Sequence, residues 1–355
     1  MNVVGKIIAL SLFIALWTGC SGGRSNDAYL SSLPELSYTL EPIDSLDLEQ
    51  QGILLPSSVV KYGRWVIIKA SQAKYNLAII NLDSHSKMDA IRVGRGPGEM
   101  LQGRITYLDG NKLVVTEVNA LTVVSLDLDL LREGYIPPLD TIGCFKPIEK
   151  ATYRFIKIND GYISLAKDYD SAWYSMWDVD GYVGNSVIRP RVPGFEKASL
   201  SAIGSFYGSS MLTAHPDGNR ACVVLMGMAA LSFSTVENRE LKEIKRVEYN
   251  VPEVVSVGGE IEISNWESKH CFEGIDSDRD YVYLLYSGKK GAADENGVPA
   301  FEGNHLLVYD WDGNPVAHYY LSHGVHGVYV DGNELYCLSW HPSPMLYVYR
   351  LPEIS

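Results

Sequence analysis

Histidine is the side chain whose pKa lies nearest to neutral pH, and this sequence has eight histidines. Five of them lie at or near expected strand ends in the C-terminal half of the chain: His215, His270, His323, His326 and His341. His323 and His326 are the closest pair, but no Cys, Asp or Glu beside them completes the ligand set of a metal site. We therefore predict loop histidines that hydrogen-bond to neighbouring groups, and no metal site.

Two further patterns could indicate chemistry, and each lacks a required residue. Gly94–Glu99 is rich in glycine but has neither the Gly-Lys-Ser/Thr ending of a phosphate loop nor the glycine spacing of a dinucleotide fingerprint. Asp276–Asp280 resembles the opening of a calcium loop, but Tyr281 and Ser287 replace the glycine and glutamate that such a loop requires. No Gly-x-Ser-x-Gly nucleophile elbow occurs after residue 35. The sequence thus predicts no catalytic residue and no cofactor.

The elements that carry these residues are short β-hairpins. Asp-Gly pairs lie between two short runs rich in Val, Ile, Tyr and Leu, which is typical of a hairpin turn. These pairs begin at Asp109, Asp160, Asp217 and Asp331, with weaker versions of the turn at Tyr62-Gly63 and Asp278–Asp280. The period of about fifty residues predicts one four-stranded unit used six times, because a single unit cannot bury both of its faces.

We therefore predict an all-β chain, a six-bladed β-propeller of four-stranded antiparallel blades. The expected units cover residues 55–93, 104–136, 152–189, 210–249, 272–321 and 325–350, with surface loops at 252–270 and 288–303. The last unit shows only three strand patterns. We expect the segment 36–43 to supply its fourth strand, because pairing the two ends of the chain would cover exposed strand edges.

The N-terminus predicts export. Lys6 precedes an apolar run from Ile7 to Trp17 that is too short to span a bilayer, and Thr18-Gly19-Cys20 follows. This segment resembles a bacterial lipoprotein signal, although Trp17 stands where an aliphatic residue is usual; an ordinary secretory signal is the alternative. We expect a signal peptide over 1–19, a polar tether over 20–34 with lipidation at Cys20, and the propeller over 35–355.

Composition narrows the function further. A content of 46% hydrophobic residues excludes general disorder, and a formal charge of −13 excludes the basic surface that nucleic-acid binding requires. Four scattered cysteines follow Cys20 without a Cys-x-x-Cys pair: Cys144, Cys222, Cys271 and Cys337. Cys222 and Cys337 lie inside strand patterns, so we expect buried free thiols.

Several segments together resemble the TolB-like six-bladed propeller lipoproteins of bacterial envelopes. They are Gly94–Glu99, His215–Gly218, Phe272–Ile275 with Tyr281–Lys289, and Tyr309–Gly313. The resemblance covers nearly all of the chain after the expected signal. It implies an envelope location and a binding role, but no particular site, because propellers carry many unrelated functions.

We expect a non-catalytic, monomeric lipoprotein of the bacterial cell envelope, held at the outer membrane by its lipid alone. It would bind a protein, peptide or glycan at one face of the propeller. The candidate ligand-binding residues are the strand-end residues expected at the mouth of the central channel: Arg95, Glu99, His215, His326 and Trp340. Arg95 could hold a ligand carboxylate, or it could brace the first two blades against Glu99.

The alternative is a hydrolase of the lactonase type, in which a six-bladed ring holds a calcium ion in its channel. Glu99, Asn119 and Asp276 are candidate ligands, although nothing in their spacing requires this function. A ring of inward carboxylates and amides would favour the hydrolase. An uncharged or aromatic channel would favour binding.

Overall fold

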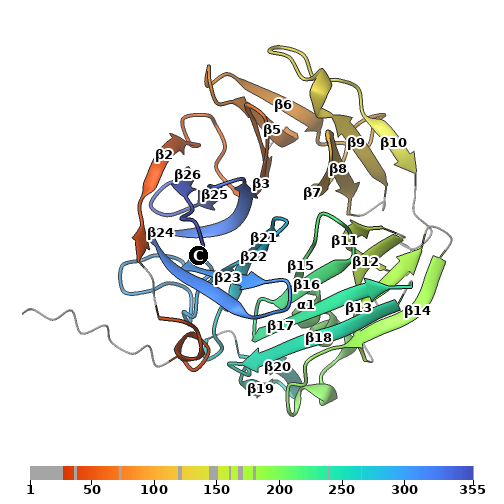
Figure 1. Cartoon of the computed structure of the whole chain (residues 1–355), viewed down its shortest axis with the longest axis vertical. Helices are drawn as coiled ribbons and strands as arrows, with labels where there is room; N and C mark the ends of the chain where they lie inside the picture. Colours follow the sequence, from red (N-terminus) through yellow and green to blue (C-terminus); the bar gives the residue numbers. More distant parts are fainter. Residues whose placement is uncertain are drawn as a thin grey trace, which may run out of the picture.

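In a computed structural model, antiparallel sheets follow one another around a central axis and form a closed ring (Figure 1). The structure describes residues 27–35, 38–71, 74–118, 122–143, 151–159, 161–166, 171–178, 181–238, 240–264 and 266–354. Each blade is antiparallel, and its strands run outward from the axis in sequence order, apart from an N-terminal strand that completes the last blade; the last two blades belong to one continuous sheet. The predicted all-β propeller is confirmed.

The first four blades are separate four-stranded sheets. Blade 1 consists of β3 (Pro56–Tyr62), β4 (Trp65–Ala70), β5 (Tyr75–Asn81) and β6 (Lys87–Arg92). Blade 2 consists of β7 (Gly103–Asp109), β8 (Lys112–Glu117), β9 (Val123–Asp127) and β10 (Asp140–Gly143). Blade 3 consists of β11 (Ala151–Ile158), β12 (Gly161–Ala166), β13 (Ala172–Asp178) and β14 (Gly181–Ile188). Blade 4 consists of β15 (Met211–Ala214), β16 (Arg220–Leu225), β17 (Ala229–Glu237) and β18 (Glu240–Tyr249).

The last two blades share one long strand. Blade 5 contains β21 (Phe272–Ser277), β22 (Tyr281–Tyr286), β23 (Gly303–Asp310) and the first part of β24 (Pro315–Asp331). The second part of β24 is the innermost strand of blade 6, followed by β25 (Glu334–Ser339) and β26 (Met345–Arg350). The strand is continuous because the chain passes from the outside of one blade to the centre of the next without a turn.

Short helices occupy the connections. They are η1 (Leu30–Ser32), η2 (Leu128–Leu130), η4 (Phe195–Lys197) and α1 (Leu200–Gly208). Ser199 caps α1, because its side chain accepts a hydrogen bond from the amide of Ala202.

Buried side chains hold neighbouring blades face to face. Middle strands such as β4, β16 and β22 are buried along nearly their whole length, because the adjacent blades cover both of their faces. The inner strand β7 is only half-buried, because it faces the central axis. The predicted Asp-Gly hairpins are confirmed at Gly110 and Gly332, whose φ angles of 58° and 60° are of the kind that the two-residue turn requires.

An N-terminal strand closes the ring, although its position differs from our prediction. β2 (Pro42–Asp47) pairs antiparallel with β26, from Pro42 opposite Tyr349 to Asp47 opposite Met345. The predicted segment 36–43 ends where this strand begins. Within it, β1 (Thr39–Leu40) pairs instead with Tyr320 and Leu321, parallel to β24 on the outside of blade 5. The apolar residues of 36–43 indicated a strand, but they could not indicate which partner it takes.

The described part of the expected tether is packed against the propeller. Tyr29 is completely buried among blades 4 and 5, and its hydroxyl group is 2.8 Å from that of Tyr309. Asp27 accepts hydrogen bonds from Asn250, Tyr286 and Lys269. Burial opposes ionisation of Asp27, but these bonds outweigh it and lower its pKa. A free tether can therefore extend only over the residues before Asp27.

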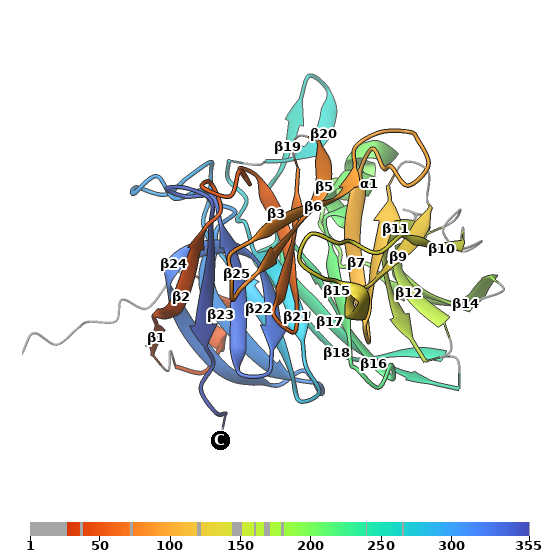
Figure 2. The ribbon, with the colours of Figure 1, turned by 90° about the horizontal axis from the view of Figure 1, so that it is seen from above.

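Two further expectations change in detail. The segment 252–270, expected as a surface loop, contains the hairpin β19 (Val254–Val257) and β20 (Glu260–Ile263), which projects from one face of the ring (Figure 2). Blade 2 extends beyond the predicted unit, because its outer strand β10 follows residue 136.

Cys222, Cys271 and Cys337 are buried free thiols as predicted, while Cys144 lies outside the described residues.

Candidate functional site

The centre of the ring contains a cavity of about 880 Å³. The innermost strand of every blade contributes to its wall, through residues that include Ser58 of β3, Arg104 of β7, Arg154 of β11, Met211 of β15, Glu273 of β21 and His326 of β24. The cavity is therefore a product of the closed ring, because no single blade could form it.

A buried asparagine fixes the wall formed by blades 1 and 2. The side-chain amide of Asn76 donates to the carbonyl oxygens of Ile91 and Met100, at 3.2 and 2.8 Å. Its oxygen accepts from the amide of Gly103 at 2.9 Å and from Lys69 Nζ at 3.4 Å. A Cβ atom at Gly103 would lie 3.0 Å from Met100 Sδ, so a larger residue would displace this contact. Asn76 thus holds the start of β7, where Arg104 enters the cavity wall.

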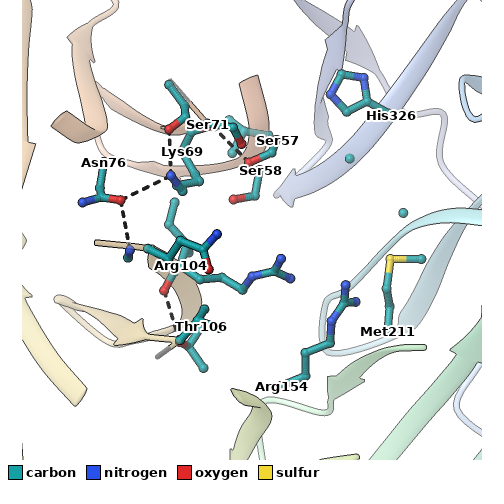
Figure 3. A pocket seen from close by; sticks show the side chains of 18 of the residues that line it. Ser57, Ser58, Lys69, Ser71, Asn76, Arg104, Thr106, Arg154, Met211 and His326 are labelled. Atoms are coloured by element: carbon teal, nitrogen blue, oxygen red, sulfur yellow. Dashed lines mark hydrogen bonds between the residues drawn. The ribbon is translucent and has the colours of Figure 1, made fainter. Parts of the chain in front are cut away.

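Three cationic side chains line the cavity among the described residues: Lys69, Arg104 and Arg154. Figure 3 shows the side chains of Arg104 and Arg154 extending into the cavity from neighbouring blades. Arg154 also donates to the carbonyl oxygen of Ser210 at 2.7 Å, which anchors its guanidinium group to the start of blade 4. Burial lowers the pKa of Lys69, and the positive charge of Arg104 lowers it further, whereas the carboxylate of Glu117 opposes the shift.

Glu273 is the acidic residue among the described lining residues. It is 8% exposed, and Oε1 lies 3.2 Å from Nδ1 of His270. Burial raises the pKa of Glu273, and its contact with His270 opposes this shift. The carboxyl group of Glu273 is therefore paired with His270, three residues before it in the chain.

The wall between blades 6 and 1 contains two residues that the sequence predicted. His326 Nε2 and Trp340 Nε1 both donate to the carbonyl oxygen of Pro56, at 2.8 and 2.7 Å. Their rings meet edge to face at 4.8 Å, and Phe301 packs against Trp340 at 5.0 Å. Behind them, the fully buried Glu302 accepts from the amide of Trp340 and lies 3.5 Å from His326 Nδ1. His326 and Trp340 are thus brought together in the cavity wall.

The other three predicted residues do not line the cavity. Arg95 is exposed in the crossing between β6 and β7. Glu99 folds back within the same crossing, where it accepts from the amide of Gly96 at 2.9 Å and lies 3.7 Å from Arg92 Nε. A Cβ atom at Gly94 would lie 1.9 Å from this carboxylate, so a larger residue there would displace the Glu99 side chain. The glycine-rich segment therefore encloses its own glutamate.

His215 lies at the other end of its inner strand. Met211, at the start of β15, lines the cavity, whereas His215 follows the last residue of that strand. Nδ1 accepts from the amide of Asp217, so Nε2 carries the proton and donates to the carbonyl oxygen of Arg279 at 2.8 Å. The ring also packs edge to face on Trp311 at 5.2 Å. The structure assigns His215 a contact between the hairpins of blades 4 and 5.

The residues considered for a calcium ion are dispersed. Asp276 accepts from the amide of Val330 at 2.6 Å, between blades 5 and 6, and neither it nor Glu99 lines the cavity. Asn119 lies outside the described residues. In the part of the chain that the structure describes, no group of three or more His, Cys, Asp or Glu side chains could hold a metal ion. The Asp276–Asp280 segment forms the hairpin tip that we expected, because Asp278 accepts from the amides of Asp280 and Tyr281.

Sequence reasoning missed Lys69, Arg104 and Arg154. Lys69 carried a signal, because it is the charged residue in the apolar run Trp65–Ala70 and a middle strand has no solvent face. Arg104 and Arg154 carried none, because a cation on an inner strand looks the same in the sequence as one on an exposed strand.

These features define a class of protein: a closed β-propeller with a polar, cation-lined central cavity. The model of the TolB-like 6-blade propeller-like family matches residues 55–333, and the chain belongs to this family. No curated protein sequence gives a significant match.

Solved structures that resemble the chain differ widely from it in sequence. A Bacteroides fragilis protein described as exported is 10% identical, with a TM-score of 0.49 over 89% of this chain and 99% of that one. Regucalcin from Agrobacterium tumefaciens is 11% identical, with a TM-score of 0.44 over 89% of this chain and 98% of that one. A luciferin-regenerating enzyme is 8% identical, with a TM-score of 0.45 over 86% of this chain and 95% of that one.

Within the described residues, the structure contains no helix of the length and apolar character needed to cross a bilayer.

Proposed function

We propose that this protein is a non-catalytic binding protein of the bacterial cell envelope whose ligand enters the central cavity. The observation that supports it is a cavity lined by all six inner strands and fixed by buried hydrogen bonds, such as those of Asn76. A rigid wall of this kind binds with little loss of conformational freedom. The ligand is a protein segment, peptide or glycan, and binding requires neither calcium nor another cofactor.

Lipid attachment at Cys20 is part of this proposal. The N-terminal pattern supports it, and the docked residue Asp27 limits how far the propeller can stand from the lipid. Residues 21–26 span about 20 Å at most when fully extended. The monomeric propeller would therefore lie close to the membrane surface. A variant that lacks the Cys20 thiol tests the lipid attachment. We expect Cys20→Ala to move the protein from the membrane fraction to the soluble fraction, and unchanged retention would contradict lipidation.

A blocked cavity tests the binding site. Ser57 lines the cavity and is exposed, so Ser57→Trp should fill the space without disturbing the core. Ser45→Trp is the matched control, because Ser45 is exposed on the outer strand β2. The purified native protein and both variants would be titrated by calorimetry with neutral oligosaccharides, acidic oligosaccharides and short peptides.

We expect saturable binding of at least one panel member to the native protein and to Ser45→Trp, and its loss in Ser57→Trp. A ligand that binds Ser57→Trp as tightly as the native protein would place the site elsewhere. Chemical conversion of the bound ligand, or its loss on chelation of calcium, would favour the hydrolase instead.

A further inference from the structure

We propose that the β19–β20 hairpin binds a partner protein, by accepting a basic, extended segment of that protein as an additional strand along β19. The site lies outside the central cavity, so the inference goes beyond the proposed function. Three features of the hairpin support it: an unpaired strand edge, exposed apolar side chains and exposed carboxylates.

The hairpin lies beside the cavity. It belongs to the connection between β18, the outermost strand of blade 4, and β21, the innermost strand of blade 5. Cys271, directly before β21, donates its amide to the carbonyl oxygen of Met226, a residue of the cavity wall, at 2.7 Å. The hairpin projects from this side of the ring (Figure 2). A partner held by the hairpin would therefore lie next to the cavity.

The edge of β19 that faces away from β20 is unpaired. The amide of Ser264 donates to the carbonyl oxygen of Glu253 at 2.8 Å, and bonded positions alternate along an antiparallel pair. The main-chain groups of Val254 and Ser256 therefore point away from β20. In the described part of the chain, no hydrogen bond reaches these groups. Each residue thus offers one donor and one acceptor to an added strand.

The sequence of β19 does not protect this edge. Edge strands commonly carry charged residues that hinder pairing with another chain. The outer strand β18 fits this rule, because most of its residues are charged, whereas β19 reads Val-Val-Ser-Val and has no charge. A strand that is both unpaired and uncharged is a template for an extended segment.

Exposed apolar side chains surround the hairpin. Four of the five most exposed large hydrophobic side chains in the described residues are here: Trp266 (70% exposed), Leu200 (63%), Val257 (58%) and Val251 (53%). Val251 and Trp266 flank the two strands in the sequence, and Leu200 begins α1, which lies against β20. Apolar surface of this kind, bordered by charged residues, is typical of protein interaction sites.

The outer face of the hairpin favours a basic partner. The inner face packs against the core between blades 3 and 4 through Val254, Ile261 and Ile263. On the outer face, Val255 lies opposite Glu262, and Val257 lies opposite Glu260. Both glutamates are exposed. A lysine or arginine of an added strand would lay its hydrocarbon part over the valines and its charge beside the glutamates. The formal charge of −13 disfavours a second copy of this chain or an anionic membrane as the occupant.

Fluorescence anisotropy with a labelled Thr-Lys-Val-Lys-Val-Lys-Thr peptide tests the proposal. One control peptide has serine in place of each lysine, and the other is N-methylated at its central amides, which removes the main-chain donors. We expect the native protein to bind the basic peptide more tightly than both controls, and less tightly as NaCl increases. Equal binding of the methylated peptide would overturn strand addition, and equal binding of the serine peptide would overturn the role of charge.

Substitutions in the hairpin locate the peptide. We expect Glu260→Gln together with Glu262→Gln to weaken binding about fivefold, as for two exposed ion pairs. Glu237→Gln together with Glu240→Gln removes the same charge from the exposed β17–β18 turn and should leave affinity unchanged. Ser256→Pro removes an outward amide but no bond to β20, so binding should fall at least about tenfold. Unchanged binding in Ser256→Pro, at the native melting temperature, would overturn the site.

Further measurements distinguish other occupants of the hairpin. The cavity-blocking variant Ser57→Trp should bind the basic peptide like the native protein, and loss of binding would place the peptide in the cavity instead. A native dimer that Ser256→Pro converts to a monomer would assign the edge to a second copy. Sedimentation with phosphatidylcholine vesicles that Trp266→Ala abolishes would assign the surface to a membrane. Each of these results, or no peptide binding at millimolar concentration, would overturn the proposal.

Discussion

At the scale of single residues, some buried polar side chains form hydrogen bonds between neighbouring blades, although burial disfavours their charged form. Asp276 is such a residue. Its carboxyl group accepts from the amide of Val330 and joins β21 to β24, and burial raises its pKa to about 7. The buried acid therefore serves as an acceptor between blades and is not part of the cavity wall.

This placement predicts a pH dependence. The pKa of an aspartate in the unfolded chain is about 3.9, so between that pH and about 7 the folded protein binds more protons than the unfolded chain. The free energy of unfolding should fall as pH rises through this window. We expect Asp276→Asn, which keeps an acceptor but cannot ionise, to be more stable than the native protein by about 2 kcal/mol at pH 8. Urea denaturation should show the difference shrinking toward pH 4, and an equal difference at both pH values would contradict it.

A second pH effect arises at His305 and His318. His305 Nδ1 lies 3.0 Å from His318 Nε2, and burial followed by the charge of His318 lowers the pKa of His305 to about 4. A histidine in the unfolded chain has a pKa of about 6.5, so stability should be lost as pH falls from about 6.5 toward 4.

We expect His305→Gln to reduce the pH dependence in this range, measured as melting temperature at pH 4.5 and 7. The native protein should lose more of its melting temperature than the variant. An identical loss in both proteins would show that other groups cause it.

The residues of the site divide into those that sequence could predict and those that it could not. His326 and Trp340 follow the strand pattern of the last unit, so their position near the axis could be inferred. Arg95 and Glu99 share the crossing between two blades, yet Glu99 turns back to Gly96, a local bond that spacing did not reveal. Arg104 and Arg154 line one cavity because the inner strands of blades 2 and 3 lie side by side, which no local sequence pattern records.

At the scale of elements, the N-terminal segment around Tyr29 is a structural part of the propeller. A tether was expected because Ser21–Asp27 is polar, as is typical of exposed chain. Tyr29, however, packs edge to face on Tyr286 and Phe272, at ring distances of 5.1 and 5.7 Å. One aromatic residue was too weak a signal to predict this docking.

Removal of the Tyr29 side chain should therefore destabilise the folded protein. We expect Tyr29→Ala to lower the free energy of unfolding by about 3–5 kcal/mol, as for other fully buried aromatic residues. Tyr38→Ala is the control, because Tyr38 is 47% exposed and should contribute little. Chemical denaturation of both variants measures the effect, and equal stability of the two would show that the segment does not anchor the fold.

At the scale of the whole molecule, the ring depends on both ends of the chain. The Asp-Gly repeat was sufficient to predict six units, because each turn requires the same backbone geometry. The repeat also predicted that an N-terminal strand closes the ring, because the last unit shows only three strand patterns and lacks a fourth. The pairing of β2 with β26 could not be predicted, because the segment 42–47 contains Asp44, Ser45 and Asp47 and shows no regular alternation of apolar and polar residues.

Truncation of the N-terminus tests whether β2 closes the ring. A chain that begins at Leu48 lacks the docked segment, β1 and β2, and leaves the edge of β26 unpaired. We expect a lower melting temperature and association of chains, compared with a chain that begins at Asp27. Because Tyr29→Ala measures the docked segment alone, the additional loss belongs to β1 and β2. Equal melting temperatures and equal elution as monomers would contradict closure by β2.

The most direct test of the cavity as a binding site is a crystal structure of the protein with the member of the calorimetric panel that binds most tightly. We predict that the ligand lies within the ring, in contact with residues of several inner strands such as Ser58, Arg104 and His326. A ligand bound on the outer strands or at the β19–β20 hairpin, with the cavity occupied only by water, would contradict this prediction.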